Sequence, residues 1–490
     1  MYWANFLHLY QPADQIPEIF DRVVAESYRP LVQLLLDHPQ VKITLNISGV
    51  LTRQLWQANH RDIVSGLATA ANRGQIEFTE SAMYHPLLPF LPADETIRQI
   101  RLNRDTNRKL LGSSYQPKGF FPPEMAYSPE ILPILVKLGF EWIILDEIAF
   151  NGRVRQAARN CTYQIAATPL RVYFRERNPS NLIMTGLVRN NADLQEVMGD
   201  EFPQKHFLIT GMDGETFGHH RPGLTELLVQ LLTSTEFDHV FFSQLPGFFP
   251  KTTVVSPLVS TWASTEKDIT EKRQFLTWKD PENPIHKLQW QFQKLVLDSV
   301  KKINTGTARE KLDRALASDQ FFWASAKPWW SLEVIEHGAW QMLDTIRSLP
   351  RAQKALLIQA ESLYHQIIAC AFQWQRTGVV RKAYRNYRET PRVPFKERTI
   401  GAGEPWVYKA FIELLEQAMR QAAIKKNFEG AILWRDAIWK LDTQNDIYDA
   451  IHAVDLLRRQ IPDSQVLAMI GKYRREYERH VSGQPEQRGT

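Results

Sequence analysis

The first half of the chain alternates short apolar runs with segments of helical periodicity, and this alternation most limits the folds open to it. Strands are expected at residues 2–7, 41–47, 75–79, 118–121, 142–145 and 206–210, with a seventh in HVFFSQL from His239. Between them lie segments such as 16–38 and 94–112, where apolar residues recur at three- and four-residue spacing. Repeated strand and helix units are typical of a parallel sheet, so we expect a closed or nearly closed α/β barrel.

The second half has a different pattern. From about Glu266 it consists of long amphipathic segments, such as 285–303, 355–375 and 448–460, with few strand signals after Leu245. We therefore expect a barrel domain over 1–265, an α-helical bundle domain over 266–480 and a flexible tail over 481–490. A stretch rich in Pro, Gly and charge, residues 387–406, is the candidate for a long loop within the helical domain.

The composition excludes several classes of protein. Among 490 residues, 44% are hydrophobic and 23% charged, as in ordinary soluble globular proteins, and the net charge of +5 is not clustered as nucleic-acid binding requires. Cys161 and Cys370 stand alone, which favours a reducing compartment. The opening MYWANFLHLYQP lacks the features of a signal peptide, and we find no run of about 18 apolar residues. We expect a cytoplasmic protein that binds neither nucleic acid nor membrane; its oligomeric state stays open.

Ionisable side chains follow nearly every expected strand. Because the active site of a β/α barrel lies at the carboxyl ends of its strands, these side chains are the first candidates for chemistry. They are His8, Glu80, His85, Glu124, Asp146 and Asp213. Three have simple structural alternatives: His8 as a hydrogen-bonded core histidine, His85 as a residue lining a turn, and Asp146 as a helix cap.

Glu124 follows two prolines, which fix the backbone and remove two amide donors. A carboxylate on such a stiff, extended turn suits a nucleophile. The same Pro-Pro-Glu sequence is also compatible with the start of a helix, where a carboxylate is favourable in the first turn. The residues alone leave both interpretations open.

Asp213 closes an apolar run and precedes Gly214, a dipeptide that is common in turns. Its neighbours distinguish it from a simple turn, because Glu215, His219 and His220 follow within eight residues. Crowded carboxylates raise one another's pKa, as a general acid requires.

Tryptophan is concentrated in one region. Seven of the 14 Trp residues lie between Trp262 and Trp340, and flat indole faces can stack on sugar rings. We expect most of them to pack in the core. The doublet Trp329 and Trp330 follows Lys327-Pro328, a sequence typical of a loop, and is the better candidate for contact with a ligand.

Four motifs occur in a fixed order: HLYQP, GQIEFTESAMYHPLLP, GFFPPE and DGETFG, followed by VSTW at residues 259–262. Together they resemble the signature regions of glycoside hydrolase family 57, whose members act on α-glucans. The resemblance implies an incomplete TIM-like (β/α)7 barrel followed by a helical domain that closes over the cleft. It agrees with the fold class expected from the patterns above.

The resemblance also implies roles for residues. In a retaining mechanism with two carboxylates, Glu124 corresponds to the nucleophile and Asp213 to the acid/base. The substrate, an α-glucan or malto-oligosaccharide, would be bound by His8, Gln11, His85, Asp146, Glu215, His219, Trp262, Trp329 and Trp330. The implied chemistry needs no metal and no cofactor.

Two residues depart from the family pattern. Tyr10 stands where the family usually has His, and Phe121 where it usually has Trp. Both carboxylates are present, so we expect activity, whereas the two departures leave the detailed specificity open. The sequence leaves open an amylase-like hydrolase, a 4-α-glucanotransferase, and branching or debranching activity.

Two further hypotheses remain. A metal-dependent polysaccharide deacetylase can have a similar barrel, but the 13 His residues include no HxxxH pair. A catalytically silent glucan-binding protein would account for the departures at Tyr10 and Phe121, whereas the presence of both carboxylates favours turnover.

Overall fold

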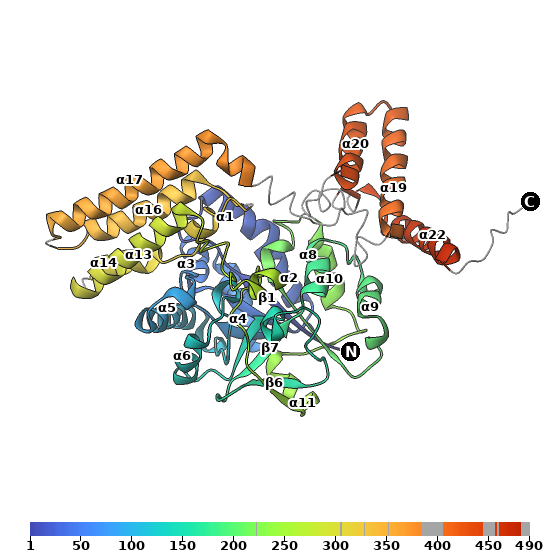
Figure 1. Ribbon diagram of the computed structural model, residues 1–490. Coiled ribbons are helices and arrows are strands. Elements are labelled where there is room, and N and C mark those ends of the chain that lie inside the picture. The colour runs from blue at the N-terminus through green and yellow to red at the C-terminus, as the bar shows by residue number, and fades with distance from the viewer. Residues whose placement is uncertain are drawn as a thin grey trace, which may run out of the picture. The chain divides into compact units, whose positions relative to one another are not determined.

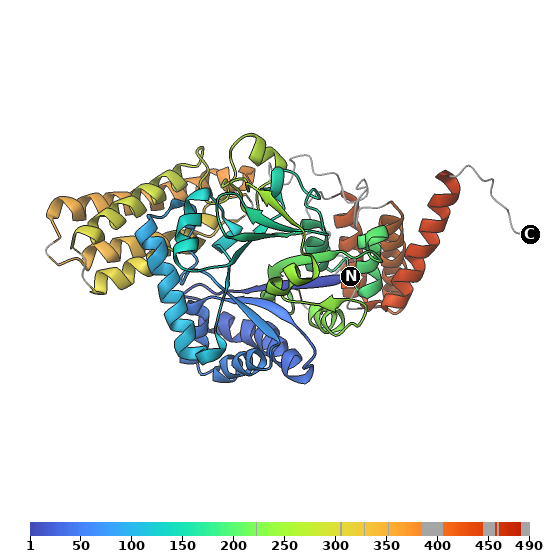
Figure 2. The ribbon, with the colours of Figure 1, turned by 90° about the horizontal axis from the view of Figure 1, so that it is seen from below.

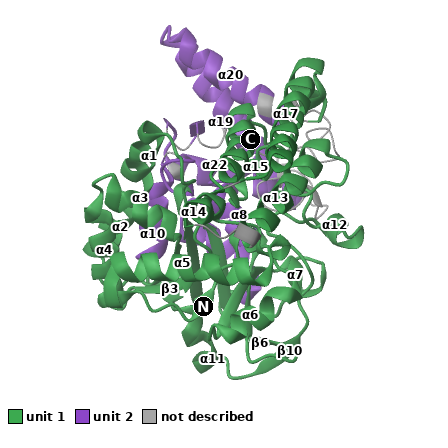
Figure 3. Cartoon of the chain, turned by 90° about the vertical axis from the view of Figure 1, so that its left-hand side faces the viewer, with its two compact units in different colours: residues 1–177, 202–215, 235–387 green, residues 178–201, 216–234, 388–490 purple. Residues whose placement is uncertain are grey.

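The computed structural model describes residues 1–221, 223–303, 306–327, 329–350, 352–383, 405–443, 456–457 and 460–481. The chain divides into two compact units, which Figure 3 draws in different colours. One consists of residues 1–177, 202–215 and 235–387, and the other of residues 178–201, 216–234 and 388–490. All the described strands belong to the first unit.

The first unit is built on a ten-stranded sheet that curls into a half-barrel (Figures 1 and 2). The strand order is β10-β6-β7-β5-β4-β3-β2-β1-β8, and β9 pairs with β1 off this path. Every described ladder is parallel except that between β6 and β7. The strands are β1 (Tyr2–Leu9), β2 (Ile43–Ile47), β3 (Ile76–Glu80), β4 (Gly119–Phe120), β5 (Trp142–Asp146), β6 (Thr162–Ile165), β7 (Arg171–Arg175), β8 (Phe207–Asp213), β9 (Asp238–His239) and β10 (Thr252–Val255).

Both faces of the sheet are covered, which explains the continuous apolar runs of its strands. On β5, Ile143 and Leu145 belong to one buried cluster, whereas Trp142 and Ile144 belong to another. This alternation is the two-residue period of a strand. The curled sheet with its helices confirms the predicted α/β class.

Six of the seven expected strands are confirmed, with ends that differ by at most three residues. The seventh, HVFFSQL, is confirmed only at His239, where β9 ends, and was predicted wrongly beyond it. After the short β9, Phe242–Gln244 forms a 3₁₀ turn, and the Gln244 side chain accepts a hydrogen bond from the Phe241 backbone N–H at 3.0 Å. That local bond replaces the ladder bonds of a strand. Strands β6, β7 and β10 were not predicted.

Helices connect the strands of the first unit. The segment 16–38 is helical as expected, but a five-residue π turn, Val24–Tyr28, interrupts it just before Pro30, a residue that cannot donate a backbone hydrogen bond. The other helices between the strands, and α12 beyond them, are α3 (Gly49–Gln57), α4 (Arg61–Asn72), α5 (Ala93–Leu111), α6 (Leu132–Lys137), α7 (Ile148–Asn151), α11 (Leu245–Phe248) and α12 (Glu266–Thr270), and the segment 16–38 itself contains α1 (Pro17–Val23) and α2 (Arg29–Asp37).

The helices that follow Trp262 pack into the same unit as the sheet. One buried cluster joins them to Leu87 and Ala126, which lie in the loops after β3 and β4. The boundary expected at residue 265 therefore does not coincide with the division into units, because these contacts tie the helices to the rim of the sheet. The helices are α13 (Pro284–Ile303), α14 (Gly306–Ala315), α15 (Asp319–Phe322), α16 (Leu332–Arg347) and α17 (Lys354–Thr377).

Helix α17 is, among the described helices, the one that is long and apolar enough to span a membrane. This property rests on the length and composition of the helix alone, and a core helix of a soluble protein meets the same two criteria. One face of α17 is buried against the other helices through Ala360, Leu363, Ile367 and Ala371. Phe372 on the same helix is 57% exposed.

Strand β8, at one edge of the sheet, approaches β7, the third strand from the other edge. No ladder joins these two strands within the described chain, but three hydrogen bonds cross between them. The Glu176 N–H donates to the Ile209 carbonyl at 2.9 Å, the Ile209 N–H donates to the Glu176 carboxylate at 3.3 Å, and Arg175 Nε donates to the Gly211 carbonyl at 2.6 Å. We call this junction the seam.

The described part of the second unit is mainly helical, with one isolated β-bridge between Phe217 and Arg221. It contains α9 (Asn191–Met198), α10 (Leu224–Leu232), α19 (Pro405–Ile424), α20 (Phe428–Thr443), α22 (Asp463–Val481) and most of α8 (Arg177–Met184). Its core includes Phe411, Leu415, Trp434 and Leu441. The predicted loop at 387–406, the predicted helix at 448–460 and the predicted tail at 481–490 lie mostly outside the described residues.

The packing of β4 against β5 generates a stability prediction. A Cβ atom at Gly119 would lie 2.2 Å from the indole of Trp142, which is almost fully buried and cannot move aside. We expect Gly119→Ala to lower the free energy of unfolding by about 1–3 kcal/mol. Gly247→Ala is the matched control, because a Cβ there meets nothing within 4 Å. Thermal unfolding of both variants tests this, and equal melting temperatures would contradict it.

Candidate active site

The parallel register places a row of polar side chains across the carboxyl ends of neighbouring strands. Asp213 on β8 pairs with His8 on β1, His8 with Asn46 on β2, and Asn46 with Thr79 on β3. Two of these contacts are hydrogen bonds: His8 Nδ1 lies 2.8 Å from Asn46 Oδ1, and Asn46 Nδ2 donates to Thr79 Oγ1 at 3.0 Å. The candidate site lies along this row.

The state of His8 follows from its partner. Because the amide nitrogen of Asn46 already donates to Thr79, its oxygen must accept from His8 Nδ1, which leaves His8 Nε2 as an acceptor. Burial lowers the pKa of His8 to about 4, so the ring is neutral near pH 7. A neutral imidazole with a free Nε2 lone pair can accept a hydrogen bond from a hydroxyl group.

Glu124 stands on a strained turn. After Pro122 and Pro123 its backbone adopts a φ of 62°, in the left-handed region, and Met125 follows with a φ of 46°. Such a conformation costs about 1–3 kcal/mol and persists only where the surroundings hold it. The turn directs Glu124 out of the helical geometry that its sequence also allowed.

Residues 260–262 hold this turn in place. The Tyr127 N–H donates to the Ser260 carbonyl at 2.9 Å, and the Trp262 N–H donates to the Glu124 carbonyl at 3.2 Å. The Trp262 indole Nε1 then donates to Glu124 Oε2 at 2.8 Å. Trp262 therefore fixes both the backbone and one carboxylate oxygen of Glu124, while Oε1 lies 3.7 Å from His85 Nδ1.

His85 completes a stack of rings beside Glu124. Its ring centroid lies 4.3 Å from that of Tyr10 and 5.2 Å from that of His8, with nearly parallel planes. Burial and the neighbouring His8 lower the pKa of His85 well below its usual value. Its Nε2 is buried without a hydrogen-bond partner, and Nδ1 lies 3.3 Å from the Ser318 hydroxyl.

Glu124 and Asp213 interact electrostatically. Burial and the negative charge of Asp213 raise the pKa of Glu124 to about 8, and the indole of Trp262 opposes this increase. Burial raises the pKa of Asp213 to about 6, against the positive charge of Arg175. With these two pKa values, the pair holds a single proton over roughly pH 6–8: one carboxyl group is protonated and the other is ionised.

Glu215 accepts hydrogen bonds from its own surroundings. Its Oε1 accepts from the Tyr28 hydroxyl, from the Tyr10 N–H at 3.1 Å and from the Gln11 side chain at 3.5 Å. Burial and Asp213 raise its pKa to about 8. Gln11 in turn accepts from Gln15 at 2.8 Å. Glu215 Oε1 and Gln11 thus hold the end of β1 in place, whereas the contact of these two side chains with a sugar stays a prediction.

Asp146 requires a correction. The resemblance implied contact with sugar, but the residue is fully buried, with Oδ2 at 2.9 Å from Arg175 Nη1 and Oδ1 at 2.6 Å from Arg177 Nε. Its Oδ1 also accepts from the Ile148 N–H at 3.0 Å. Asp146 is therefore the anion of a buried ion-pair cluster.

The two tryptophans of the doublet are both half-buried. Trp330 packs against the core of the helices and stacks on Trp374 at 6.0 Å, and its contact with a sugar stays a prediction. Trp329 is half-buried and stacks on Phe322 at 5.0 Å. His219 belongs to the second unit, where its ring lies 5.5 Å from that of His220.

The structure adds a carboxylate that the sequence analysis missed. Asp319, the first residue of α15, accepts a hydrogen bond from the Tyr10 hydroxyl at 2.7 Å, and its negative charge helps to raise the pKa of Glu124. Burial raises the pKa of Asp319 itself. The only sequence signal is a Ser-Asp pair at the start of a helix, which is usually just a cap.

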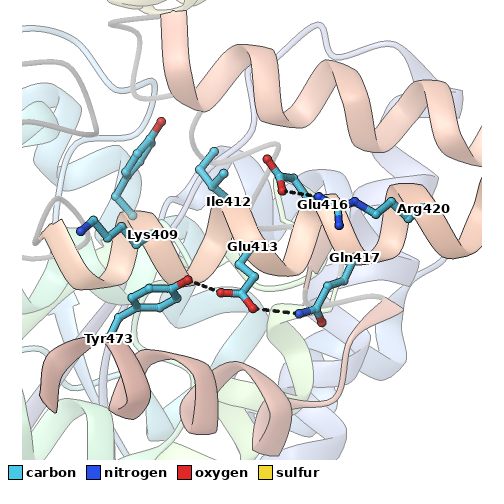
Figure 4. Close-up of a pocket in the computed structure, with 8 residues that line it drawn as sticks. Lys409, Ile412, Glu413, Glu416, Gln417, Arg420 and Tyr473 are labelled. Atoms are coloured by element: carbon cyan, nitrogen blue, oxygen red, sulfur yellow. Dashed lines mark hydrogen bonds and ion pairs between the residues drawn. The ribbon is translucent and has the colours of Figure 1, made fainter. Parts of the chain in front are cut away.

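The second unit carries a separate groove of about 370 Å³ (Figure 4). It lies along α19 beside Tyr473 of α22. Glu413 there accepts from Gln417 and from Tyr473, and Glu416 pairs with Arg420. Because these carboxylates already have partners, the groove offers less chemistry than the row at the strand ends. Among the described residues, no group of three or more His, Cys, Asp or Glu could hold a metal ion.

Comparison with known proteins matches residues 4–240 to the family described as glycosyl hydrolase family 57. An alpha-amylase of Pyrococcus horikoshii is 25% identical over 283 residues, or 54% of this chain and 43% of that protein. A 4-alpha-glucanotransferase of Thermococcus litoralis is 24% identical over 280 residues, or 54% of this chain and 42% of that protein. The chain thus aligns with less than half the length of these two relatives.

A solved structure shows the same fold. The GH57-type branching enzyme of Pyrococcus horikoshii superposes with a TM-score of 0.58 and 16% identity, over 76% of this chain and 96% of that one. The fold likeness extends beyond the residues that the family match covers.

The cluster around Asp146 generates a prediction. We expect Asp146→Ala to lower the free energy of unfolding by about 3–5 kcal/mol, because it leaves buried guanidinium groups without their anion. Asp62→Ala is the control: Asp62 pairs with Arg29 at the surface, where the loss is at most about 1 kcal/mol. Chemical denaturation of both variants tests this, and a similar loss in the two would contradict the assignment of Asp146.

Proposed function

We propose that this chain, whose residues 4–240 form a glycosyl hydrolase family 57 domain, is an enzyme that cleaves α-glucans with retention of anomeric configuration. The observation that carries the proposal is the placement of two carboxyl groups beside the stacked rings of His8 and His85: Asp213 pairs with His8 in the ladder, and Glu124 Oε1 lies 3.7 Å from His85 Nδ1. The raised pKa values of both carboxyl groups support it. The names of the relatives, alpha-amylase and 4-alpha-glucanotransferase, support the α-glucan substrate class.

Glu124 is the nucleophile in this proposal. Because the Trp262 indole donates a hydrogen bond to Glu124 Oε2, Glu124 Oε1 is the oxygen that attacks the anomeric carbon. As the ester bond to Glu124 forms, the glycosidic bond breaks, and Asp213 transfers its proton to the departing oxygen. In the second step Asp213 takes a proton from water or a sugar hydroxyl, which attacks the same carbon and releases Glu124.

The shared proton has to be on Asp213 for the first step, whereas in the empty site Glu124 holds it more strongly. Two groups favour the required arrangement: the Trp262 indole stabilises ionised Glu124, and the glycosidic oxygen of a bound substrate accepts from protonated Asp213. Substrate binding therefore selects the reactive protonation state.

The neutral histidines bind sugar hydroxyl groups. His8 Nε2 accepts from one hydroxyl, and the buried Nε2 of His85 pairs with another. Because both side chains are uncharged near pH 7, they do not neutralise Glu124 before it attacks. Whether water or a second sugar completes the reaction depends on how well acceptor sites exclude water.

Incubation with maltoheptaose and separation of the products by length tests the proposal. Shorter products alone indicate hydrolysis, and longer ones indicate glucan transfer. We expect Glu124→Gln to lower the rate more than about 10³-fold and Asp213→Asn about 10²–10⁴-fold, because each removes one of the two carboxyl groups. Glu130→Gln, at an exposed position shortly after Glu124, is the matched control. Full activity of Glu124→Gln, or binding without turnover by the wild type, would contradict the proposal.

The pH dependence is a second prediction. Activity requires the singly protonated pair, so kcat/KM should rise as the pair loses its first proton near pH 6 and fall as it loses the second near pH 8. Initial rates at substrate concentrations well below KM, between pH 4.5 and 9.5, measure both limbs. A profile that stays flat from pH 5 to 9 would show that this pair does not control the reaction.

A further inference from the structure

We propose that Arg175 is a positioning residue for the reaction: it crosses the seam of the half-barrel and holds the end of β8, and with it Asp213, in place. The inference rests on the proposed function, in which Asp213 is the acid/base. Neither the family match nor the resemblance of the motifs points to Arg175.

The seam makes β8 dependent on Arg175. On one side, β8 is bound to β1 along its whole length, from Phe207 to Asp213. On its other side, the three hydrogen bonds of the seam join it to the end of β7. Of these, the bond from Arg175 Nε to the Gly211 carbonyl lies nearest to the carboxyl end, two residues before Asp213.

The side chain of Arg175 is itself held rigidly. It is 5% exposed, and Nη1 donates to Asp146 Oδ2 at 2.9 Å while Nε donates to Gly211. Asp146 stands opposite Arg175 in the ladder between β5 and β7, so the guanidinium bridges β5 and β8. The planar fork of arginine permits both bonds at once, which a lysine ammonium on a flexible stem does not reproduce.

Gly211 allows this approach. A Cβ atom there would lie 3.3 Å from Arg175 Cγ, which is tighter than ordinary contact, and 3.4 Å from Phe6 Cδ1. The aliphatic part of Arg175 therefore lies across the backbone of β8 at a position without a side chain.

The charge of Arg175 acts on Asp213 as well. Asp213 faces Glu124 from the turn after β4, Glu215 from its own loop, His8 from β1 and Tyr28 from the π turn Val24–Tyr28, none of which is a cation near pH 7. Arg175 is the cation that lowers the pKa of Asp213 against burial. It shares Asp146 with Arg177, and Glu147 also lies in its field.

The pH profile separates this role from a structural one. In Arg175→Met we expect the acid limb of kcat/KM to move up by about one pH unit or more, because the cation that favours ionised Asp213 is gone. In Arg175→Lys the limb should stay near that of the wild type while kcat falls, because the charge remains and the geometry does not. Arg177→Met is the matched control, because it also removes a guanidinium that pairs with Asp146. Within the described chain, Arg177 donates hydrogen bonds to Glu147, Asp146 and Thr261 and to no residue of β8.

A second readout needs no activity. Asp213 has a raised pKa in the folded protein, so folded-state stability falls as the pH rises from its unfolded value, near 3.9, through the folded value. We expect the melting temperature of Arg175→Met to fall more between pH 5 and 8 than that of Arg177→Met. In an Asp213→Asn background this extra dependence should disappear.

The outcomes are distinct. Acid limbs and pH-dependent melting that are the same for Arg175→Met and Arg177→Met would overturn the role of Arg175 and leave the proposed function standing. A wild type that forms no product from any glucan would overturn the proposed function, while the melting cycle would still decide whether Arg175 acts on Asp213.

Discussion

The parallel pairing of β8, β1, β2 and β3 is the constraint on which the rest of the site depends. It brings Asp213, His8, Asn46 and Thr79 into one row, and the bonds along that row set the tautomer of His8. Burial raises the pKa of four carboxyl groups near this row, those of Glu124, Asp213, Glu215 and Asp319. Near pH 7 the site therefore holds both protonated and ionised carboxyl groups, with the neutral rings of His8 and His85 beside them.

Two further sets of hydrogen bonds connect this row to residues far away in the chain. Residues 260–262 hold the strained turn of Glu124, and α15 supplies Asp319 to the hydroxyl of Tyr10. Tyr10, which departs from the family pattern, is thereby given a partner, and Phe121, the other departure, packs against His8 with ring centroids 4.6 Å apart. Both departures are thus accommodated by contacts within the site.

Much of this arrangement was predictable, and the exceptions have physical reasons. Parallel strands buried on both faces appear in the sequence as apolar runs, so six strands and the rim residues that follow them were found. Asp146 and Asp213 both end a strand, and only the register opposite Arg175 shows that the first is enclosed by arginines. Asp319 was missed because it follows no strand, and the stacking of Trp330 on Trp374 depends on helix packing that sequence neighbours cannot reveal.

The most direct test of the account is to trap the glycosyl-enzyme. An α-configured 5-fluoro glucosyl or maltosyl fluoride forms the ester quickly and releases it slowly, so digestion and mass spectrometry can locate the sugar. The account predicts one sugar on the peptide that contains Glu124, and its loss in Glu124→Gln. A sugar attached to Asp213 or to another side chain, in a protein that turns over glucan, would contradict the assignment of the nucleophile.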